Sequence, residues 1–346
     1  MSQQERQVLR RPRADDRVMR DVLFGISGYP VVLVAHDLKL YALLAERPRT
    51  IPEVCDALSI KTRPAEVLVS VSAALGLLVE TDGRYSLTAM AEDYLLDSSP
   101  TYFGGYFDMM IRNYSMYAFD SVKAAVLTDT PQMYGGEEAF KSHQEREDRA
   151  RSYTRAMHST SMAAALAWPE CIDLSGRHRM LDVAGGSGAH AIGAALRWLD
   201  LEVIVLELAS VCSLAEELIV QQGLQNRVRT QAGDMWEDPF PAADLHFYSQ
   251  IYHDWPPERC QFLTRKSFDS LEPGGLLIIH EMLYNDRKTG PFSTAAMNVN
   301  MLLQYKTARQ YSGHELTTML TEAGFVDVRF MPTFGYYSIV VGQKPG

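Results

Sequence analysis

The stretch MLDVAGGSGAHA, from Met180 to Ala191, decides the fold. An apolar run leads into a glycine-rich turn, and the turn leads into small residues that begin a helix. The turn fits the pattern G-x-G-x-x-A at Gly186, Gly188 and Ala191, where glycine permits positive φ and close approach of a ligand to the backbone. The stretch therefore predicts the first strand, ligand-binding turn and helix of a Rossmann-like domain.

Strands and helices alternate from this point to the end of the chain. We predict strands over 179–184, 202–208, 228–234, 243–250, 275–283, 325–333 and 336–344, and helices over 189–199, 211–223, 257–271, 292–304 and 313–323. Strict alternation implies a parallel, doubly wound sheet with right-handed crossovers. Because only a short turn separates the last two strands, we expect a seven-stranded sheet whose last strand is antiparallel.

The N-terminal part of the chain is predicted to be mainly helical. TIPEVCDALSI begins with Thr50 as a helix N-cap, Pro52 just inside the helix and Glu53 three residues after the cap. A second helix is expected over about 62–76, and LLVETDGRYSL is typical of a strand, an Asp-Gly turn and a second strand. Two helices followed by a two-stranded wing predict a winged helix.

A winged helix can bind DNA or mediate dimerisation. The second helix carries only Lys61, Arg63 and Glu66 as charges, whereas a recognition helix needs a polar, basic face. The net charge of −10 also argues against a nucleic-acid partner. We therefore expect a homodimer formed through this domain, with no nucleic-acid partner.

The composition indicates a soluble globular protein. The chain has 346 residues, of which 47% are hydrophobic and 22% charged. No apolar run approaches the roughly 18 residues needed to cross a bilayer, so we expect no membrane partner. The cysteines are widely spaced and form no CxxC pair, which suits a reducing cytoplasm and offers no metal framework. They are Cys55, Cys171, Cys212 and Cys260.

We divide the chain into three parts. Residues 1–105 form the predicted winged-helix dimerisation domain, and residues 171–346 form the α/β domain. Residues 106–170, rich in Met, Tyr and Phe, are predicted to be a helical linker that also supplies pocket walls for a flat apolar ligand.

Three acids fall at the carboxyl ends of successive strands. Asp182 lies just before the glycines, Glu207 follows Gly188 by nineteen residues, and Asp234 ends the third strand. A carboxylate at Glu207 can accept both hydroxyls of a ribose, and Asp234 can reach an adenine amino group. Three acids would repel a pyrophosphate but suit a sulfonium and an amino group. The site therefore favours S-adenosylmethionine over a dinucleotide.

The order DVAGGSG, LEL, GDMW, HDW and a later glutamate resembles the S-adenosylmethionine-dependent small-molecule O-methyltransferases. These include the plant caffeate type, the animal acetylserotonin type and bacterial natural-product enzymes, and the resemblance covers nearly the whole chain. It implies methyl transfer to a hydroxyl of a small aromatic or secondary-metabolite acceptor. It assigns the cofactor to Asp182, Gly185, Gly186, Gly188, Glu207, Leu208, Gly233, Asp234, Met235, Ser249, Asp254 and Trp255.

The resemblance makes His253, in the HDW motif, the general base. Imidazole with a pKa of about 6.5 can accept a hydroxyl proton near neutral pH. Glu281, 28 residues further on, matches the first of two acids that orient the base in plant relatives. Gln310 stands at the second, where it can hydrogen-bond the imidazole or the substrate but supplies no charge.

The neighbouring residues have supporting roles in this interpretation. Trp255 is expected to pack against adenine or close the corner between strand and helix. Asp254 is expected to bind cofactor or to cap the helix that starts at the two following prolines. Ser249 stands where plant relatives carry a lysine.

Four residues are candidates for acceptor binding. Tyr153 and Met157 match the family's aromatic-x-x-x-Met stretch, and Met301 lies in the predicted 292–304 helix. Arg112 lies in an apolar segment and is a candidate for binding a substrate carboxylate.

Other functions stay open at the level of sequence. A C-methyltransferase acting on an α-keto acid would suit Arg112 and Gln310, and no metal is expected, because no second histidine accompanies His253 from residues 292–305. A non-catalytic relative that binds S-adenosylmethionine or DNA would not need His253 and Glu281, yet both are present. An NAD-dependent dehydrogenase would not need the acid cluster.

Overall fold

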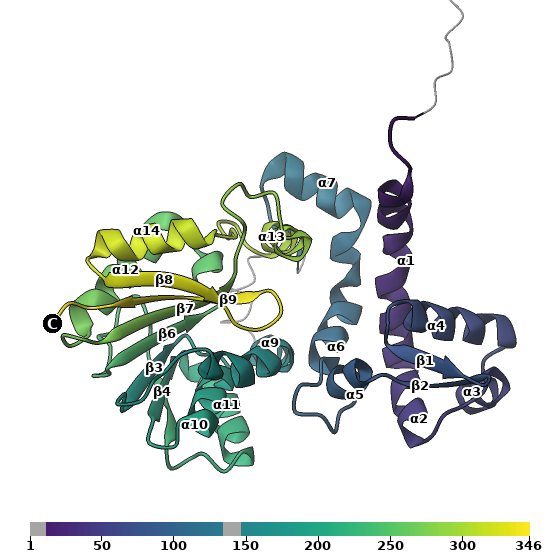
Figure 1. The fold of residues 1–346 in the computed structure, drawn as a ribbon, viewed down its shortest axis with the longest axis horizontal. Helices are drawn as coiled ribbons and strands as arrows, with labels where there is room; N and C mark the ends of the chain where they lie inside the picture. The colour runs from purple at the N-terminus through teal and green to yellow at the C-terminus, as the bar shows by residue number, and fades with distance from the viewer. Residues whose placement is uncertain (1–11, 134–146) are drawn as a thin grey trace, which may run out of the picture. The chain divides into compact units, whose positions relative to one another are not determined.

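The computed structural model describes residues 12–133 and 147–346, and the chain divides into two units, residues 1–96 and 97–346 (Figure 1). The first unit contains helices and one two-stranded sheet. Its elements are α1 (Arg17–Asp37), α2 (Leu40–Glu46), α3 (Ile51–Leu58), α4 (Thr62–Ala74), β1 (Leu78–Thr81), β2 (Arg84–Leu87) and α5 (Ala89–Leu95).

The start of α3 and the β1–β2 hairpin form as their local sequence predicts. Thr50 accepts a hydrogen bond from the backbone of Glu53, and the Glu53 carboxylate accepts one from the backbone of Thr50, which completes a capping box. Asp82 and Gly83 have φ of 52° and 75°, the left-handed backbone that a tight hairpin turn between β1 and β2 requires.

Helix α1 differs from the expectation that no apolar run is long enough to cross a membrane. It spans 21 residues and contains an 18-residue window of mean hydropathy 1.5, of which 17% is buried. By length and composition alone it qualifies as a span. Its exposed apolar side chains include Val18, Met19, Val22, Leu23, Phe24 and Ile26.

The second unit is built on a seven-stranded sheet of order β5-β4-β3-β6-β7-β9-β8. Strand β9 runs antiparallel to both of its neighbours and the others run parallel, which confirms the predicted doubly wound sheet. The strands are β3 (Arg179–Val183), β4 (Glu202–Glu207), β5 (Val228–Ala232), β6 (Leu245–Ser249), β7 (Leu276–Met282), β8 (Val326–Pro332) and β9 (Tyr337–Gln343).

Helices cover both faces of this sheet (Figure 1). Helices α9, α10 and α11 lie on one face, and α12 and α14 lie on the other. The helical elements are α6 (Gly104–Asn113), η1 (Tyr114–Tyr117), α7 (Phe119–Thr128), α9 (Glu147–Ala167), η3 (Trp168–Glu170), α10 (Ala189–Arg197), α11 (Ala209–Gln221), η4 (Tyr252–Asp254), α12 (Pro257–Ser270), α13 (Phe292–Gln304) and α14 (Gly313–Ala323).

Successive residues of β6 anchor the two halves of the core. Phe247 faces the first layer and stacks on Trp168 with ring centroids 4.4 Å apart, whereas Tyr248 faces the second layer and meets Tyr252 edge to face at 5.4 Å. All four side chains are fully buried. This packing fixes the strand end from which the candidate site is built.

Candidate active site

The carboxylate of Glu207, at the end of β4, is hydrogen-bonded to the glycine-rich turn after β3. The N–H of Gly186 donates to Glu207 Oε2 at 2.9 Å, and the N–H of Leu208 donates to Oε1 at 2.7 Å. Gly186 and Gly188 have φ of 56° and 74°, and a Cβ at Gly186 would meet no atom within 4 Å. The turn is therefore open to a ligand, as the glycine pattern predicts.

Asp182 is a buried carboxylate with no hydrogen-bond partner among the described residues. Burial and the nearby Glu207 raise its pKa to about 8, against a smaller lowering effect of the Ala191 backbone N–H. A Cβ at Gly185 would come within 2.6 Å of this carboxylate, so only glycine fits there. An unsatisfied buried carboxylate beside an open turn is complementary to a cationic ligand.

The turn after β5 is held in place by α12. Gly233 N–H donates to the Glu207 carbonyl at 3.0 Å, and Trp236 N–H donates to Asp234 Oδ1 at 2.7 Å. Lys266, which the sequence analysis missed, donates from Nζ to the carbonyl of Met235 at 2.8 Å. It also donates to the carbonyls of Trp236 and Asp238, and its ammonium lies 4.4 Å from the centroid of the Phe240 ring.

His253 lies in η4, directly after β6, and has a carboxylate near each ring nitrogen. Nδ1 is 2.8 Å from Glu281 Oε2, and Nε2 is 3.5 Å from Asp254 Oδ1. The backbone N–H of His253 also donates to Glu281 Oε1 at 3.3 Å. The structure thus brings together the predicted base and its orienting acid from neighbouring strand ends, and all three side chains are buried.

Burial and the neighbouring carboxylates have opposite effects on the pKa of His253. Burial lowers the pKa of His253, but Glu281 and Asp254 together overcome it and raise the pKa to about 9. Burial raises the pKa of Asp254 to about 7, against the opposing effect of His253. The two carboxylates therefore outweigh burial and favour the protonated form of the imidazole.

Asp254 does not have the capping role that was one of its two predicted roles. The N-cap of α12 is Pro256, and no side chain caps that helix. The carboxylate lies beside the imidazole instead. Trp255 meets Trp236 edge to face at 4.8 Å, at the corner between β6 and α12.

Gln310 lies in the loop between α13 and α14, and is buried beside the turn that carries His253. The N–H of the preceding residue, Arg309, donates to the His253 carbonyl at 2.7 Å. The side chain of Gln310 makes no hydrogen bond to His253 or to any other described residue. The predicted contact with the imidazole is therefore absent from the described part of the chain.

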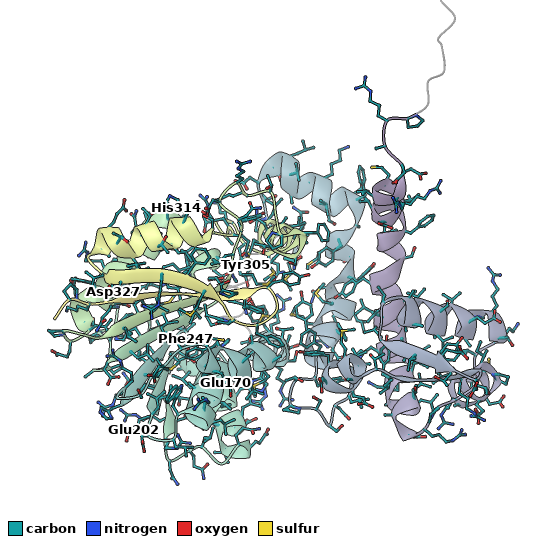
Figure 2. The ribbon with its side chains drawn as sticks, in the orientation of Figure 1. Glu170, Glu202, Phe247, Tyr305, His314 and Asp327 are labelled. Atoms are coloured by element: carbon teal, nitrogen blue, oxygen red, sulfur yellow. The ribbon has the colours of Figure 1, made fainter. Side chains whose placement is uncertain are left out.

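The predicted acceptor residues fall into two groups. Tyr153 on α9 hydrogen-bonds Tyr305 through their hydroxyl oxygens at 2.7 Å, and Met301 packs against Tyr305. Figure 2 shows Tyr305 at the end of the sheet opposite Glu202, which is the end where the parallel strands finish. Arg112 is different, because its guanidinium is exposed and donates to Ser152 Oγ at 2.7 Å.

Three histidines near the site, His190 and His280 buried and His158 half-buried, are not predicted from the sequence. Ser249 Oγ lies 2.9 Å from both His190 Nε2 and His280 Nδ1. His158 Nδ1 lies 2.9 Å from Ser187 Oγ in the glycine turn. Burial lowers the pKa of His158 to about 4 and that of His190 to about 3, so these imidazoles are neutral. Ser249, assigned to the cofactor by resemblance, has its hydroxyl engaged by the two rings.

Metal-binding side chains do not gather anywhere in residues 12–133 and 147–346. No group of three His, Cys, Asp or Glu side chains in these ranges could hold a metal ion.

Comparison with known proteins gives the same family from sequence and from structure. Residues 119–326 match the O-methyltransferase domain family model. The 3-hydroxy-5-methyl-1-naphthoate 3-O-methyltransferase of Streptomyces sahachiroi is 35% identical over 330 residues, covering 94% of this chain and 95% of that protein. The L-tyrosine C(3)-methyltransferase of Streptomyces lavendulae is 28% identical over 334 residues, covering 93% and 91%. The crystal structure of human N-acetylserotonin methyltransferase in complex with S-adenosylmethionine superposes with a TM-score of 0.84 at 26% identity, covering all of both chains.

Proposed function

This chain belongs to the O-methyltransferase family, and we propose from that premise that it methylates a hydroxyl of a small aromatic acceptor with His253 as general base. The enzyme is an S-adenosylmethionine-dependent O-methyltransferase. The observation that carries the proposed mechanism is the 2.8 Å contact between His253 Nδ1 and Glu281. A carboxylate can only accept a hydrogen bond, so Nδ1 carries the hydrogen and Nε2 is left to take a proton.

The residues at the carboxyl ends of the strands fit the cofactor. Bound S-adenosylmethionine supplies an electrophilic methyl group on a sulfonium. We assign Glu207 to the ribose hydroxyls and Asp234 with Met235 to the adenine, since these follow β4 and β5 in order. The unpartnered Asp182 faces the cationic part of the ligand, with Gly185, Gly186 and Gly188 giving room for close approach.

Asp254 partly substitutes for the second acid of the plant relatives, at whose position this chain has Gln310. When His253 accepts the hydroxyl proton, the imidazolium is stabilised by Glu281 on one nitrogen and by Asp254 on the other. A phenol has a pKa of about 10, so proton transfer to an imidazole whose pKa is raised to about 9 is only slightly uphill. Transfer to an imidazole of pKa about 6.5 would be uphill by about 5 kcal/mol. The two acids therefore make His253 a stronger base.

The acceptor pocket is proposed to lie against α9 and α13. Tyr153, Met157 and Met301 offer a flat, polarisable wall, which suits an aromatic ring. The naphthoate named for the Streptomyces sahachiroi relative supports a fused aromatic acceptor from secondary metabolism. An acceptor that carries a carboxylate could pair it with the exposed guanidinium of Arg112.

The N-terminal unit is proposed to be a winged-helix dimerisation domain. Helices α3 and α4 followed by the β1–β2 hairpin support that architecture. Six large apolar side chains of α1, Val18 to Ile26, are 61–75% exposed, and soluble proteins rarely leave such a surface uncovered. A second copy of the chain would cover it. We further propose that the dimer is cytoplasmic, which its four unpaired cysteines support.

Mass spectrometry tests the proposed reaction. The protein is incubated with S-adenosylmethionine and separately with 2-naphthol, hydroxynaphthoates and α-keto acids, alongside His253→Ala. A single added methyl group on a hydroxyl, lost in the variant, is the expected result. Methylation of the keto acids alone would refute O-methylation of an aromatic acceptor and favour C-methylation.

A further inference from the structure

Gln310 carries an unused pair of hydrogen-bonding groups beside the base. Its side chain is 2% exposed, and neither its amide oxygen nor its amide nitrogen has a partner in the parts of the chain that the structure describes. Buried amides in folded proteins are nearly always hydrogen-bonded, because an unsatisfied one loses its hydration without compensation. The missing partner therefore points to a ligand.

The backbone around Gln310 is fastened to the turn that carries the base. Arg309 N–H donates to the His253 carbonyl and the Tyr311 hydroxyl donates to the Trp255 carbonyl, both at 2.7 Å. The N–H of Gln310 itself donates to Asn298 Oδ1 at 3.1 Å. Three bonds within three residues fix the loop segment that carries this side chain, and two of them fasten it to the turn of His253.

The base does not need this amide. Each ring nitrogen of His253 already has a carboxylate beside it, Glu281 at Nδ1 and Asp254 at Nε2. An amide adds no charge to stabilise an imidazolium. What is left for Gln310 to contact at this place is the acceptor.

We propose that Gln310 recognises a neutral substituent next to the reacting hydroxyl of the acceptor, one that both donates and accepts a hydrogen bond. The inference rests on the proposed function and specifies its acceptor class. A carboxamide is the best match, because its oxygen accepts from the Gln310 amide nitrogen while its N–H donates to the Gln310 oxygen. A carboxylate satisfies only the amide nitrogen, and it would lie close to the acids Glu281 and Asp254.

Three matched probes test this recognition by calorimetry on the full chain loaded with S-adenosylhomocysteine. They are 2-naphthol, 3-hydroxy-2-naphthoate and 3-hydroxy-2-naphthamide, which differ only in the group beside the hydroxyl. Two added hydrogen bonds predict that the carboxamide binds about tenfold more tightly than 2-naphthol. In Gln310→Met, which keeps the length and loses the amide, the preference should fall below twofold.

Gln343→Met is the control, because it removes a half-buried glutamine of β9 that pairs with the first residue of β7, at the end of the sheet away from His253, and it should keep the preference. Gln310→Glu provides a second variant of the same shape and should also lose the preference, because a carboxylate oxygen replaces the donor. Equal affinities for the three probes in the wild-type protein, no binding of the carboxamide, or a preference that survives in Gln310→Met would each overturn the inference. Methyl transfer to 2-naphthol does not depend on this preference, and it tests the proposed function separately.

Discussion

His253 lies between two carboxylates in a site that is almost closed to water, and its chemistry depends on their balance. Glu281 fixes the ring through Nδ1, while the Asp254 carboxyl group lies near Nε2, the nitrogen proposed to take the proton. Asp254 is the neighbour of His253 in sequence, so both come from the same short turn after β6. A positively charged ligand bound near these acids would lower the pKa of His253 and prepare it to accept a proton.

Replacing the base should remove most of the catalysis and little of the cofactor binding. We expect His253→Ala to lower kcat/KM for an aromatic acceptor by roughly 10²- to 10⁴-fold, the usual contribution of a general base. Steady-state kinetics measure this loss, and calorimetry with S-adenosylhomocysteine checks that the cofactor still binds. His314→Ala changes an exposed histidine on α14 and should keep full activity (Figure 2). An equal loss in both variants would contradict the assignment.

Removing the charge of Asp254 should shift the rising part of the pH profile of kcat/KM to lower pH. The base works when deprotonated, so kcat/KM should rise with pH as His253 loses its proton, and the carboxylates of Glu281 and Asp254 raise the pKa at which it does so. Asp254→Asn removes one of the two charges that raise this pKa, so the rising limb should move to lower pH. The measurement is kcat/KM from pH 6 to pH 10. An unchanged limb, or one moved to higher pH, would show that Asp254 does not act on His253.

At the scale of elements, the sequence predicts what depends on local pattern. The capping box at Thr50, the Asp-Gly hairpin and every strand of the large sheet follow from residues close together in the chain. Glu281 is predicted from the family resemblance, and the parallel pairing of β6 with β7 explains why its side chain lies at the same edge of the sheet as His253. Lys266 and His280 could not be predicted, since their partners come from other strands and turns and nothing in their own sequence context distinguishes them.

The turn after β5 should depend on Lys266 for its shape. This ammonium bonds three carbonyls of the turn and lies over Phe240, so Lys266→Met should loosen the segment that carries Asp234. We expect the affinity for S-adenosylhomocysteine, measured by calorimetry, to fall about tenfold, as for the loss of one or two charged hydrogen bonds. Lys344→Met is the control, because that lysine also bonds a carbonyl, that of Leu271, and lies over a ring, Phe268, neither of which belongs to the turn. Equal effects of the two substitutions would rule out a specific role of Lys266.

At the scale of the whole molecule, the exposed half of α1 needs an explanation that a single chain does not give. The sequence predicts no apolar run of membrane-spanning length, yet α1 passes that test by length and composition. The same apolar residues that make it pass would also make a dimer interface. Charged residues introduced on α1 test the dimer interface directly.

Charges introduced on α1 should separate the subunits. Leu23→Asp and Phe24→Asp together place two carboxylates on a surface that is 61–62% exposed in the single chain, so the fold should survive. Burying unpaired charges in an interface is costly, so the mass in light scattering should fall from two chains to one. Val79→Asp changes another exposed apolar residue, on β1, and should leave the mass unchanged. A wild-type protein that is already monomeric without detergent would contradict the dimer.

The serine between two histidines at the end of β6 has one further consequence. A hydroxyl has a single hydrogen, so Ser249 can donate to only one of the rings and must accept from the other. His190 and His280 are both neutral, so the tautomer of one dictates the tautomer of the other. The three side chains therefore have two arrangements that differ only in the direction of their hydrogen bonds. Switching between them reverses a small electric dipole inside the protein without moving a heavy atom.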